Sequence, residues 1–323
     1  MLVVLVAVMA ILVLFSLIYR VLRWKRHPMA EEIQSRTLTW WWMIAVFMLA
    51  LATHRLVSFA FLGFLCFAAL REYYSLMPAE ETDESKVLAF KDRLCVWITY
   101  LSVPLTVYVA YIGWYDLFII LAPVYLFLLM PAVFVMQGRT NGAIRSLGFL
   151  ALGFMFFVFN MGHCLFMINM GAFVLLYCFA LTEARDLLAF LLGKGLQALT
   201  ANHSEAGWAR VLNYRIAAPV SPNKTWSAGI LTAVLIALLS LIFVPFMPDF
   251  PDGRLTYAFG GVIGLSIGFL GLLGDLVFSM VKRDLGTKDF GTTLAGHGGV
   301  IDRIDSLIYT VPITFHLLYW QYF

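Results

Sequence analysis

The chain has 323 residues, of which 62% are apolar and 13% are charged, and its formal net charge is +3. A water-soluble globule of this size covers its surface with more polar side chains than these, so the composition excludes a soluble protein and predicts one embedded in a lipid bilayer. The small net charge does not indicate nucleic acid, and we expect no nucleic-acid partner.

Apolar runs along the chain predict about ten membrane-spanning helices, since a helix needs about 20 residues to cross the hydrocarbon core. The first run has no basic residue before it and no small-residue cleavage site after it, which favours a retained helix over a cleaved signal peptide. The third run is short for a span. We therefore predict an all-α fold, a polytopic transmembrane helix bundle. The runs lie near residues 1–19, 37–53, 56–70, 95–112, 116–136, 146–160, 164–183, 227–247, 255–280 and 304–323.

Lysine and arginine residues gather after the first run and then after every second run. Only Arg55 and Arg254 fall on the opposite side. Cytoplasmic segments of membrane proteins carry this excess of basic residues. We therefore expect both termini on the non-cytoplasmic side of the cell (inner) membrane.

The four cysteines lie in or beside apolar runs and show neither CxxC spacing nor a pairing with histidines. Such spacing would be typical of a zinc or iron–sulfur site. We interpret them as small apolar packing residues, as free cysteines in protein cores commonly are. They are Cys66, Cys95, Cys164 and Cys178.

The ninth run carries glycines at intervals of three, four and three, on one helical face where another helix can approach closely. The same face continues to Asp275, Ser279 and Lys282. A carboxylate at this depth is costly to bury and indicates a functional site. The alternative is an ion pair of Asp275 with Lys282 or Arg283 that holds helices together. The glycines are Gly261, Gly264, Gly268 and Gly271.

A glycine-containing loop follows this helix and leads into the last run. Glycines just before a helix free backbone N–H groups to bind anionic oxygens, and the helix dipole adds to the attraction. Acids and cations crowd both sides of the loop, and a magnesium-bound polyphosphate would use both signs of charge. The residues are Gly296, His297, Gly298 and Gly299 in the loop, the acids Asp275, Asp302 and Asp305, and the cations Lys282, Arg283, Lys288 and Arg303.

The order of these residues resembles the signature of the CDP-diacylglycerol synthase, or phosphatidate cytidylyltransferase, family. Residues 221–226 (Ser-Pro-Asn-Lys-Thr-Trp) and the stretch from Asp186 to Lys194 resemble two further segments of that family. The likeness covers the C-terminal 140 or so residues in patches. We therefore divide the chain into N-terminal helices, 1–183 with about seven spans, and a cytidylyltransferase-like catalytic part, 184–323 with about three. The signature residues are Ser279, Lys282, Arg283, Lys288, Asp289, His297, Gly298, Gly299, Asp302, Arg303 and Asp305.

The resemblance implies that the phosphate of phosphatidate attacks the α-phosphorus of CTP, giving CDP-diacylglycerol and pyrophosphate for phospholipid biosynthesis. It implies Mg²⁺ as cofactor, held by Asp275 and Asp302, with Asp305 and Asp289 as second choices and K⁺ as a candidate second metal. Catalysis at the cytoplasmic face would use both metal ligands with Lys282, Arg283, Lys288 and Arg303. Substrate binding would use Ser221, Lys224, Thr225, Ser279, Gly296, His297, Gly298, Gly299 and Asp186.

Several positions depart from the family pattern, and alternatives stay open. One is a cytidylyltransferase acting on another lipid phosphate; a second is a catalytically silent paralogue. A third is a membrane transporter, because intramembrane acids and glycine-broken helices also mark transport pathways. For any single cation the alternative is ordinary anchoring at the membrane surface. A homodimer is the candidate assembly. The departures are Phe278, Leu187, Leu188, Ser227 and Ala295.

Overall fold

The computed structural model describes residues 30–77, 83–201, 206–291 and 298–323, with a few positions between 13 and 24. Helices dominate these residues, and the one sheet among them is a two-stranded hairpin, which confirms the predicted all-α class. The predicted span at 1–19 lies largely outside the described residues, as do Ala295, Gly296 and His297.

Six of the described helices are long and apolar enough to cross a membrane. They lie on predicted spans, so the multi-pass membrane character is confirmed, while the total of about ten and the side of each terminus remain predictions. A shorter apolar helix covers Trp41–Ala52. The six are Arg55–Ser75, Arg93–Tyr111, Tyr115–Met136, Ala143–Met170, Trp226–Phe246 and Tyr257–Asp284.

The chain divides into two compact units, and each unit joins segments that are far apart in the sequence. The first consists of residues 1–165 and 289–303, and the second of 166–288 and 304–323. The loop predicted to bind anions therefore belongs to the first unit. The functional division after residue 183 remains a prediction.

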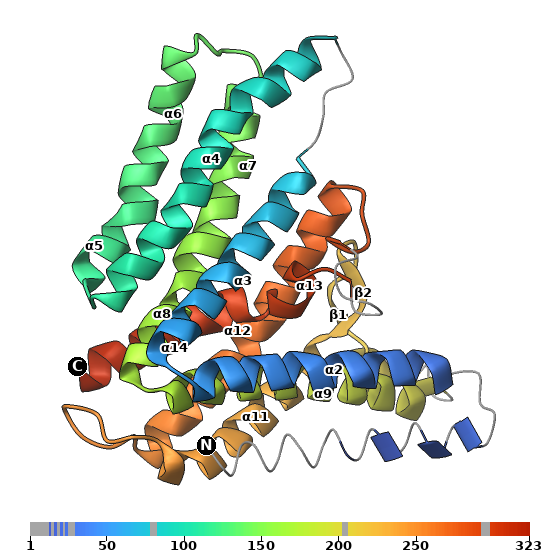
Figure 1. Cartoon of the computed structure of the whole chain (residues 1–323). Coiled ribbons are helices and arrows are strands. Elements are labelled where there is room, and N and C mark those ends of the chain that lie inside the picture. The colour runs from blue at the N-terminus through green and yellow to red at the C-terminus, as the bar shows by residue number, and fades with distance from the viewer. Residues whose placement is uncertain are drawn as a thin grey trace. The chain divides into compact units, whose positions relative to one another are not determined.

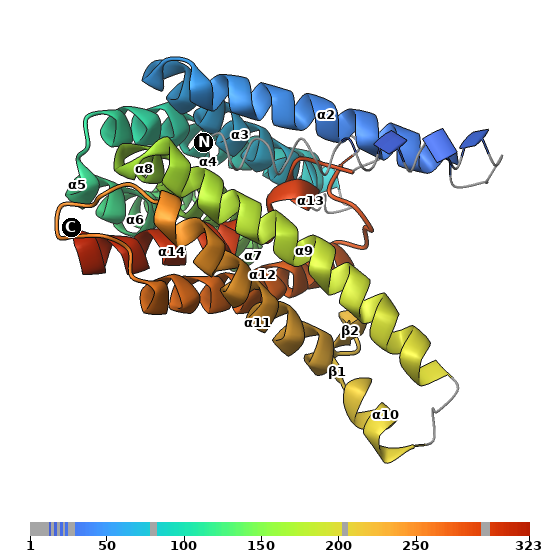
Figure 2. The ribbon, with the colours of Figure 1, turned by 90° about the horizontal axis from the view of Figure 1, so that it is seen from below.

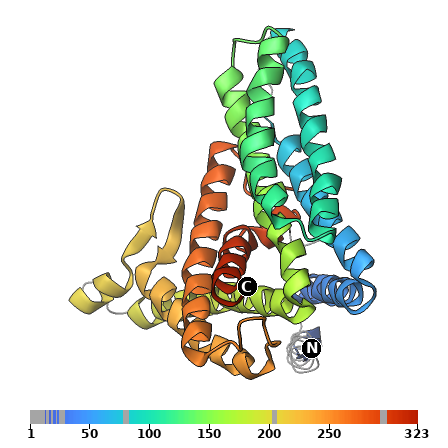
Figure 3. The same ribbon diagram turned by 90° about the vertical axis from the view of Figure 1, so that its left-hand side faces the viewer.

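The first unit consists of long helices that pack along their lengths. α3 packs against α4, and α4, α6 and α7 lie side by side (Figures 1 and 3). Two π-helical segments, η1 and η2, continue the α-helices that precede them. The elements are α2 (Ala30–Ala52), α3 (Arg55–Ser75), α4 (Asp83–Tyr111), α5 (Tyr115–Ile120), η1 (Leu121–Leu126), α6 (Phe127–Met136), α7 (Ala143–Phe154), η2 (Met155–Asn160) and the start of α8 (Met161–Met170).

One predicted boundary is wrong. The sequence separates runs at 146–160 and 164–183, but Ala143–Met170 is one continuous helix. The break comes at Gly171, whose φ of 136° is a backbone conformation that only glycine adopts readily. The polar residues near 160 do not end the helix, because His163 is buried and its Nδ1 hydrogen-bonds at 2.9 Å to the carbonyl oxygen of Phe159.

The second unit is built around α11, which packs along both α12 and α9 (Figure 2). β1 and β2 form an antiparallel hairpin that pairs Arg215 with Thr225 and Ala217 with Ser221. The hairpin lies at the start of α11 (Figure 3). The elements are α9 (Ala172–Thr200), α10 (Gly207–Leu212), β1 (Arg215–Ala217), β2 (Ser221–Thr225), α11 (Trp226–Phe243), η4 (Val244–Phe246), α12 (Tyr257–Asp284) and α14 (Leu307–Tyr322); α13 (Ile301–Ile304) straddles the two units.

The glycine face of α12 is the contact that brings α11 close, as predicted. A Cβ at Gly264 would lie 2.7 Å from the Cα of Ala237, and one at Gly268 would overlap the backbone of Ala233. The seam starts at Gly260 rather than at the predicted Gly261. A Cβ at Gly260 would lie 2.5 Å from Val244, whereas one at Gly261 would meet only Leu241 at an ordinary 3.7 Å.

Candidate active site

A cluster of charged side chains lies in the second unit, at the end of the glycine seam. Lys224 Nζ of β2 lies 2.5 Å from Oδ2 of Asp275, which stands on α12. Arg185 of α9 lies 3.8 Å from the same oxygen and forms an ion pair with its neighbour Asp186. Ser306 Oγ donates a hydrogen bond to Asp186 Oδ1 at 3.2 Å. Residues separated by up to 120 positions thus meet at one place.

The glycines of α12 make room for this cluster. A Cβ at Gly271 would lie 3.0 Å from Cδ of Arg185, and one at Gly274 would lie 2.7 Å from the carbonyl oxygen of Asp305. Any larger residue would push the guanidinium or the chain before α14 away. The seam predicted for helix packing therefore also shapes the charged site.

The cluster is graded from buried to accessible. The Arg185 side chain is only 2% exposed, whereas those of Asp275 and Asp186 are 31% and 38% exposed. A buried guanidinium is stable only when carboxylates pair with it, and here Asp186 and Asp275 do so. Their accessible faces leave the two carboxylates open to a charged ligand, whereas Nζ of Lys224 is buried against Asp275.

The ion pairs of Asp275 join three elements of the second unit, α9, β2 and α12. The packing alternative drawn from the sequence was an ion pair of Asp275 with Lys282 or Arg283 of the same helix. The Asp305 carboxylate is close enough to Asp275 and Asp186 for repulsion, and Lys282 offsets part of it. The cluster thus places three acids near cations, as a site for a metal-bound phosphate requires.

The acids of the cluster are the candidate ligands of the expected magnesium ion. Among the residues that the structure describes, no group of three or more histidine, cysteine, aspartate or glutamate side chains is arranged to hold a metal. Mg²⁺ nevertheless often takes only one or two protein carboxylates and completes its shell with water and substrate phosphates. The partly exposed Asp275 and Asp186 fit that mode.

The ends of the predicted anion-binding loop are held together in the first unit. Asp302 Oδ2 accepts hydrogen bonds from the backbone N–H groups of Phe290 and Gly299, both at 2.9 Å. Glu72 of α3 accepts one from the N–H of Ile301 at 2.8 Å. A carboxylate therefore already binds the N–H of Gly299, which belongs to the loop that the sequence predicted to bind a substrate anion.

The sequence alone did not identify Glu72 and Arg185 as site residues. The signal available for both was a charge at the end of an apolar run. That signal does not indicate which residues they contact, which are Ile301 for Glu72 and Asp275 for Arg185.

The other predicted site residues are distributed over both units. Thr225 is buried and caps α11, since its Oγ1 accepts a hydrogen bond from the N–H of Ala228 at 3.3 Å. Gly298 has a φ of 76° beside the Asp302 carboxylate. Phe278, one of the departures from the family pattern, is fully buried. Partly buried or exposed positions are taken by Ser221, Ser279, Lys282, Arg283, Lys288, Asp289 and Arg303.

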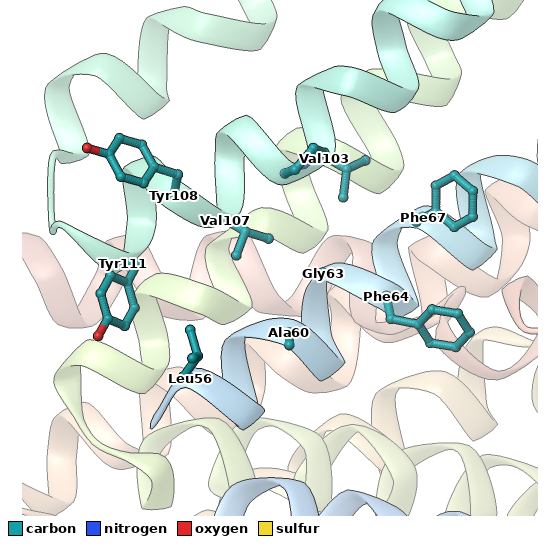
Figure 4. Close-up of a pocket in the computed structure, with 10 residues that line it drawn as sticks. Leu56, Ala60, Gly63, Phe64, Phe67, Val103, Val107, Tyr108 and Tyr111 are labelled. Carbon is teal, nitrogen blue, oxygen red and sulfur yellow. The ribbon is translucent and has the colours of Figure 1, made fainter. Parts of the chain in front are cut away.

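An open apolar groove lies between α3 and α4 of the first unit (Figure 4). Its volume of about 620 Å³ is within the range of small-molecule pockets. The residues that line it, among them Gly63, Phe64 and Val107, include no charged side chain. A polyphosphate would find no charged partner here, so the groove suits hydrocarbon and the charged cluster remains the candidate for the chemistry.

The comparisons with known proteins agree with these features. A family model described as the cytidylyltransferase family matches residues 34–321. The uncharacterized protein YnbB of Escherichia coli K12 is 29% identical over 317 residues, which cover 96% of this chain and 95% of that protein.

Two phosphatidate cytidylyltransferases match over shorter lengths. That of Synechocystis is 33% identical over 153 residues, and that of Haemophilus influenzae is 34% identical over 143 residues. The matches cover 46% and 44% of this chain, and the chain spans 44% of each of the two enzymes. The likeness to these two enzymes thus extends over less than half of their length.

Proposed function

Because the chain belongs to the cytidylyltransferase family of nucleotidyltransferases, we propose that it transfers the cytidylyl group of CTP to phosphatidate in the membrane. The products are CDP-diacylglycerol and pyrophosphate. The single observation that carries this proposal is the cluster in which Asp275 meets Lys224 and Arg185 at the end of the glycine seam. Both kinds of charge that a metal-bound triphosphate needs lie within one site, whose carboxylates are partly exposed.

The reaction requires little acid–base catalysis by the protein. A lipid phosphate monoester, with a second pKa of about 6, is largely dianionic at neutral pH and can attack without a general base. One of its oxygens forms a bond to the α-phosphorus of CTP, the bond from that phosphorus to the bridging oxygen breaks, and pyrophosphate takes the electron pair. Positioning and charge neutralisation then supply the catalysis.

We assign the roles within this chain accordingly. Lys224 neutralises phosphate charge, and the buried Arg185 holds Asp275 and Asp186 in place. These two carboxylates would hold Mg²⁺, and Asp302 is a further proposed ligand. The bound ion would supply charge neutralisation at the phosphates. Arg283, Lys288 and Arg303, with Lys282, are the proposed partners of the remaining phosphate oxygens.

A related lipid phosphate is the second candidate acceptor. The relative that spans nearly the whole chain is uncharacterized, and the phosphatidate cytidylyltransferases match only part of it. Leu187 is exposed near the cluster residue Asp186, at a position where the family usually has a small hydroxyl residue. A larger apolar residue there favours an acceptor whose shape differs from that of phosphatidate.

The proposal is tested with purified protein in detergent–lipid micelles containing Mg²⁺, labelled CTP and a lipid phosphate. We expect CDP-lipid formation that stops when a chelator removes the metal and returns when Mg²⁺ is restored. Asp275→Asn and Asp302→Asn should each lower kcat/KM by at least about 100-fold, the loss typical of a group that stabilises transition-state charge.

Asp249→Asn is the matched control, because the Asp249 side chain is 66% exposed and pairs with Arg254 outside the cluster. It should leave the rate within about twofold of the unmodified protein, as expected for a surface ion pair. Absence of CDP-lipid with every lipid phosphate offered would contradict the proposal. Equal activity of both site variants and the control would contradict the assigned site.

A further inference from the structure

Residues 298–303, which lead into α14, are held by a carboxylate from a helix that is distant in sequence. Glu72 stands at the C-terminal end of α3, is 9% exposed, and accepts the N–H of Ile301 at 2.8 Å across 229 positions. A polar group this far from water stays in place only when it is hydrogen-bonded. The contact therefore fixes the start of α13 against α3 within the first unit.

Two glycines of the loop surround the same carboxylate. A Cβ at Gly299 would lie 2.5 Å from Cδ of Glu72, and one at Gly291 would lie 2.9 Å from it. Neither glycine has a positive φ, so neither is required by the backbone conformation. Their missing side chains make room for Glu72.

Asp302 is held next to this contact. Its Oδ2 binds the N–H of Gly299, and Gly299 lies between the Asp302 and Glu72 carboxylates. A displacement of Glu72 releases Ile301 and frees Gly299 to move, and this loosens one of the two backbone contacts that orient Asp302, the other being the N–H of Phe290. The same segment carries Asp302, which the proposed function makes a ligand of the Mg²⁺ bound to the triphosphate, and Arg303, which it pairs with phosphate oxygens.

We propose that Glu72 is a positioning residue for CTP, acting through the hydrogen bond to Ile301 and the glycine-lined space that hold Asp302 and the loop. This inference rests on the proposed function. Glu72 itself contacts loop backbone, so it is not a catalytic residue. Its substitution should weaken CTP binding and leave the lipid acceptor unaffected.

The kinetic test compares Glu72→Ala, Glu72→Gln and Gly299→Ala. Glutamine keeps an oxygen that accepts the N–H of Ile301, whereas alanine keeps none. A methyl group at position 299 would push the carboxylate away from Ile301. We expect Glu72→Ala and Gly299→Ala each to raise KM for CTP about tenfold with KM for the lipid unchanged, and Glu72→Gln to stay within about threefold, as expected for the loss or retention of one buried hydrogen bond.

The double variant Glu72→Ala/Gly299→Ala should be no worse than Glu72→Ala alone, because both changes remove the same contact. Gly148→Ala is the matched control, since a Cβ there meets no atom within 4 Å, and it should leave both KM values unchanged. If Glu72 only stabilised the fold, its substitution would lower the melting temperature and the active fraction. It would not raise KM for CTP above KM for the lipid relative to the unmodified protein.

Hydrogen exchange read by mass spectrometry tests the contact without turnover. Peptides containing Ile301 should exchange faster in Glu72→Ala and Gly299→Ala than in Glu72→Gln and Gly148→Ala. Unchanged exchange, or additive effects of the two substitutions on KM for CTP, would overturn the inference. A different outcome is that the unmodified protein makes no CDP-lipid while exchange rises as expected in Glu72→Ala and Gly299→Ala. The proposed function would then fail, and with it the role of Glu72 in CTP binding. The contact between Glu72 and Ile301 would still stand.

Discussion

Thr225, the neighbour of the cluster residue Lys224, combines a structural role with a predicted site role. The family resemblance assigns it to substrate binding, yet its hydroxyl group caps the first turn of α11. A cap at this point fixes the direction in which α11 leaves β2, and β2 also carries Lys224. The same side chain can therefore stabilise the helix and position the cation that meets Asp275.

Thr225→Ala tests the two roles separately. Loss of an N-cap hydroxyl typically costs about 1 kcal/mol of stability. Thr256 is the matched control, since its Oγ1 caps α12 by accepting the N–H of Phe259 at 3.2 Å. We expect both alanine variants to lower the melting temperature similarly, but only Thr225→Ala to reduce kcat/KM, by about tenfold or more. Equal activity of the two variants would show that Thr225 caps α11 and has no role in the site.

Among the elements, the pair α11 and α12 depends on close backbone contact. Lipid surrounds membrane helices with surface as apolar as their own, so they associate through packing and hydrogen bonds rather than through the hydrophobic effect. Small residues on both helices meet this need. Ser240 also donates a hydrogen bond to the Gly260 carbonyl oxygen at 2.5 Å and accepts one from the hydroxyl of Tyr177 at 2.7 Å. The seam is thus both tight and polar.

Gly268→Ala is predicted to weaken this helix pair. The added methyl group would overlap the backbone of Ala233, which cannot rotate away, and overpacking of this kind costs about 1 to 3 kcal/mol. Gly261→Ala is the control, because its Cβ meets only Leu241 at 3.7 Å. Thermal unfolding in detergent should show a lower midpoint for Gly268→Ala and an unchanged or higher midpoint for Gly261→Ala. The reverse order would show that the seam does not limit the packing.

At the scale of the whole molecule, the distribution of basic residues predicts the orientation in the membrane. The turn between β1 and β2 and the segment that follows η4 lie at opposite ends of α11, one of the helices long enough to span. The positive-inside rule places the first in the cytoplasm with Lys224 and the second outside with Arg254. The charged cluster would then face the compartment that supplies CTP.

Cysteine labelling measures this orientation. The four native cysteines are all buried, so they give a low background with a membrane-impermeant maleimide. Ala218 and Asp252 are both exposed and lie on either side of α11. In intact spheroplasts we expect Asp252→Cys to be labelled and Ala218→Cys to be protected until the membrane is permeabilised. The opposite pattern would reverse the predicted topology.

The features that the sequence predicted are those that depend on neighbouring positions. The apolar length of each run predicts a membrane helix, and a glycine interval of three or four places small residues on one face. The family resemblance likewise rests on the order of residues along the chain, and the family assignment is confirmed over residues 34–321. These properties are local, so they can be read without knowing which helices meet.

Only the tertiary structure decided which distant residues become partners. Nothing in the spacing of Glu72 and Ile301, or of Lys224 and Asp275, indicates that each pair is in contact. The break at Gly171 likewise depended on backbone conformation, since the buried His163 bonds within its own helix instead of ending it. Length and order along the chain therefore determined the membrane class and the family. Packing determined the site, because burying a charge in this protein requires a partner that only the folded chain brings near.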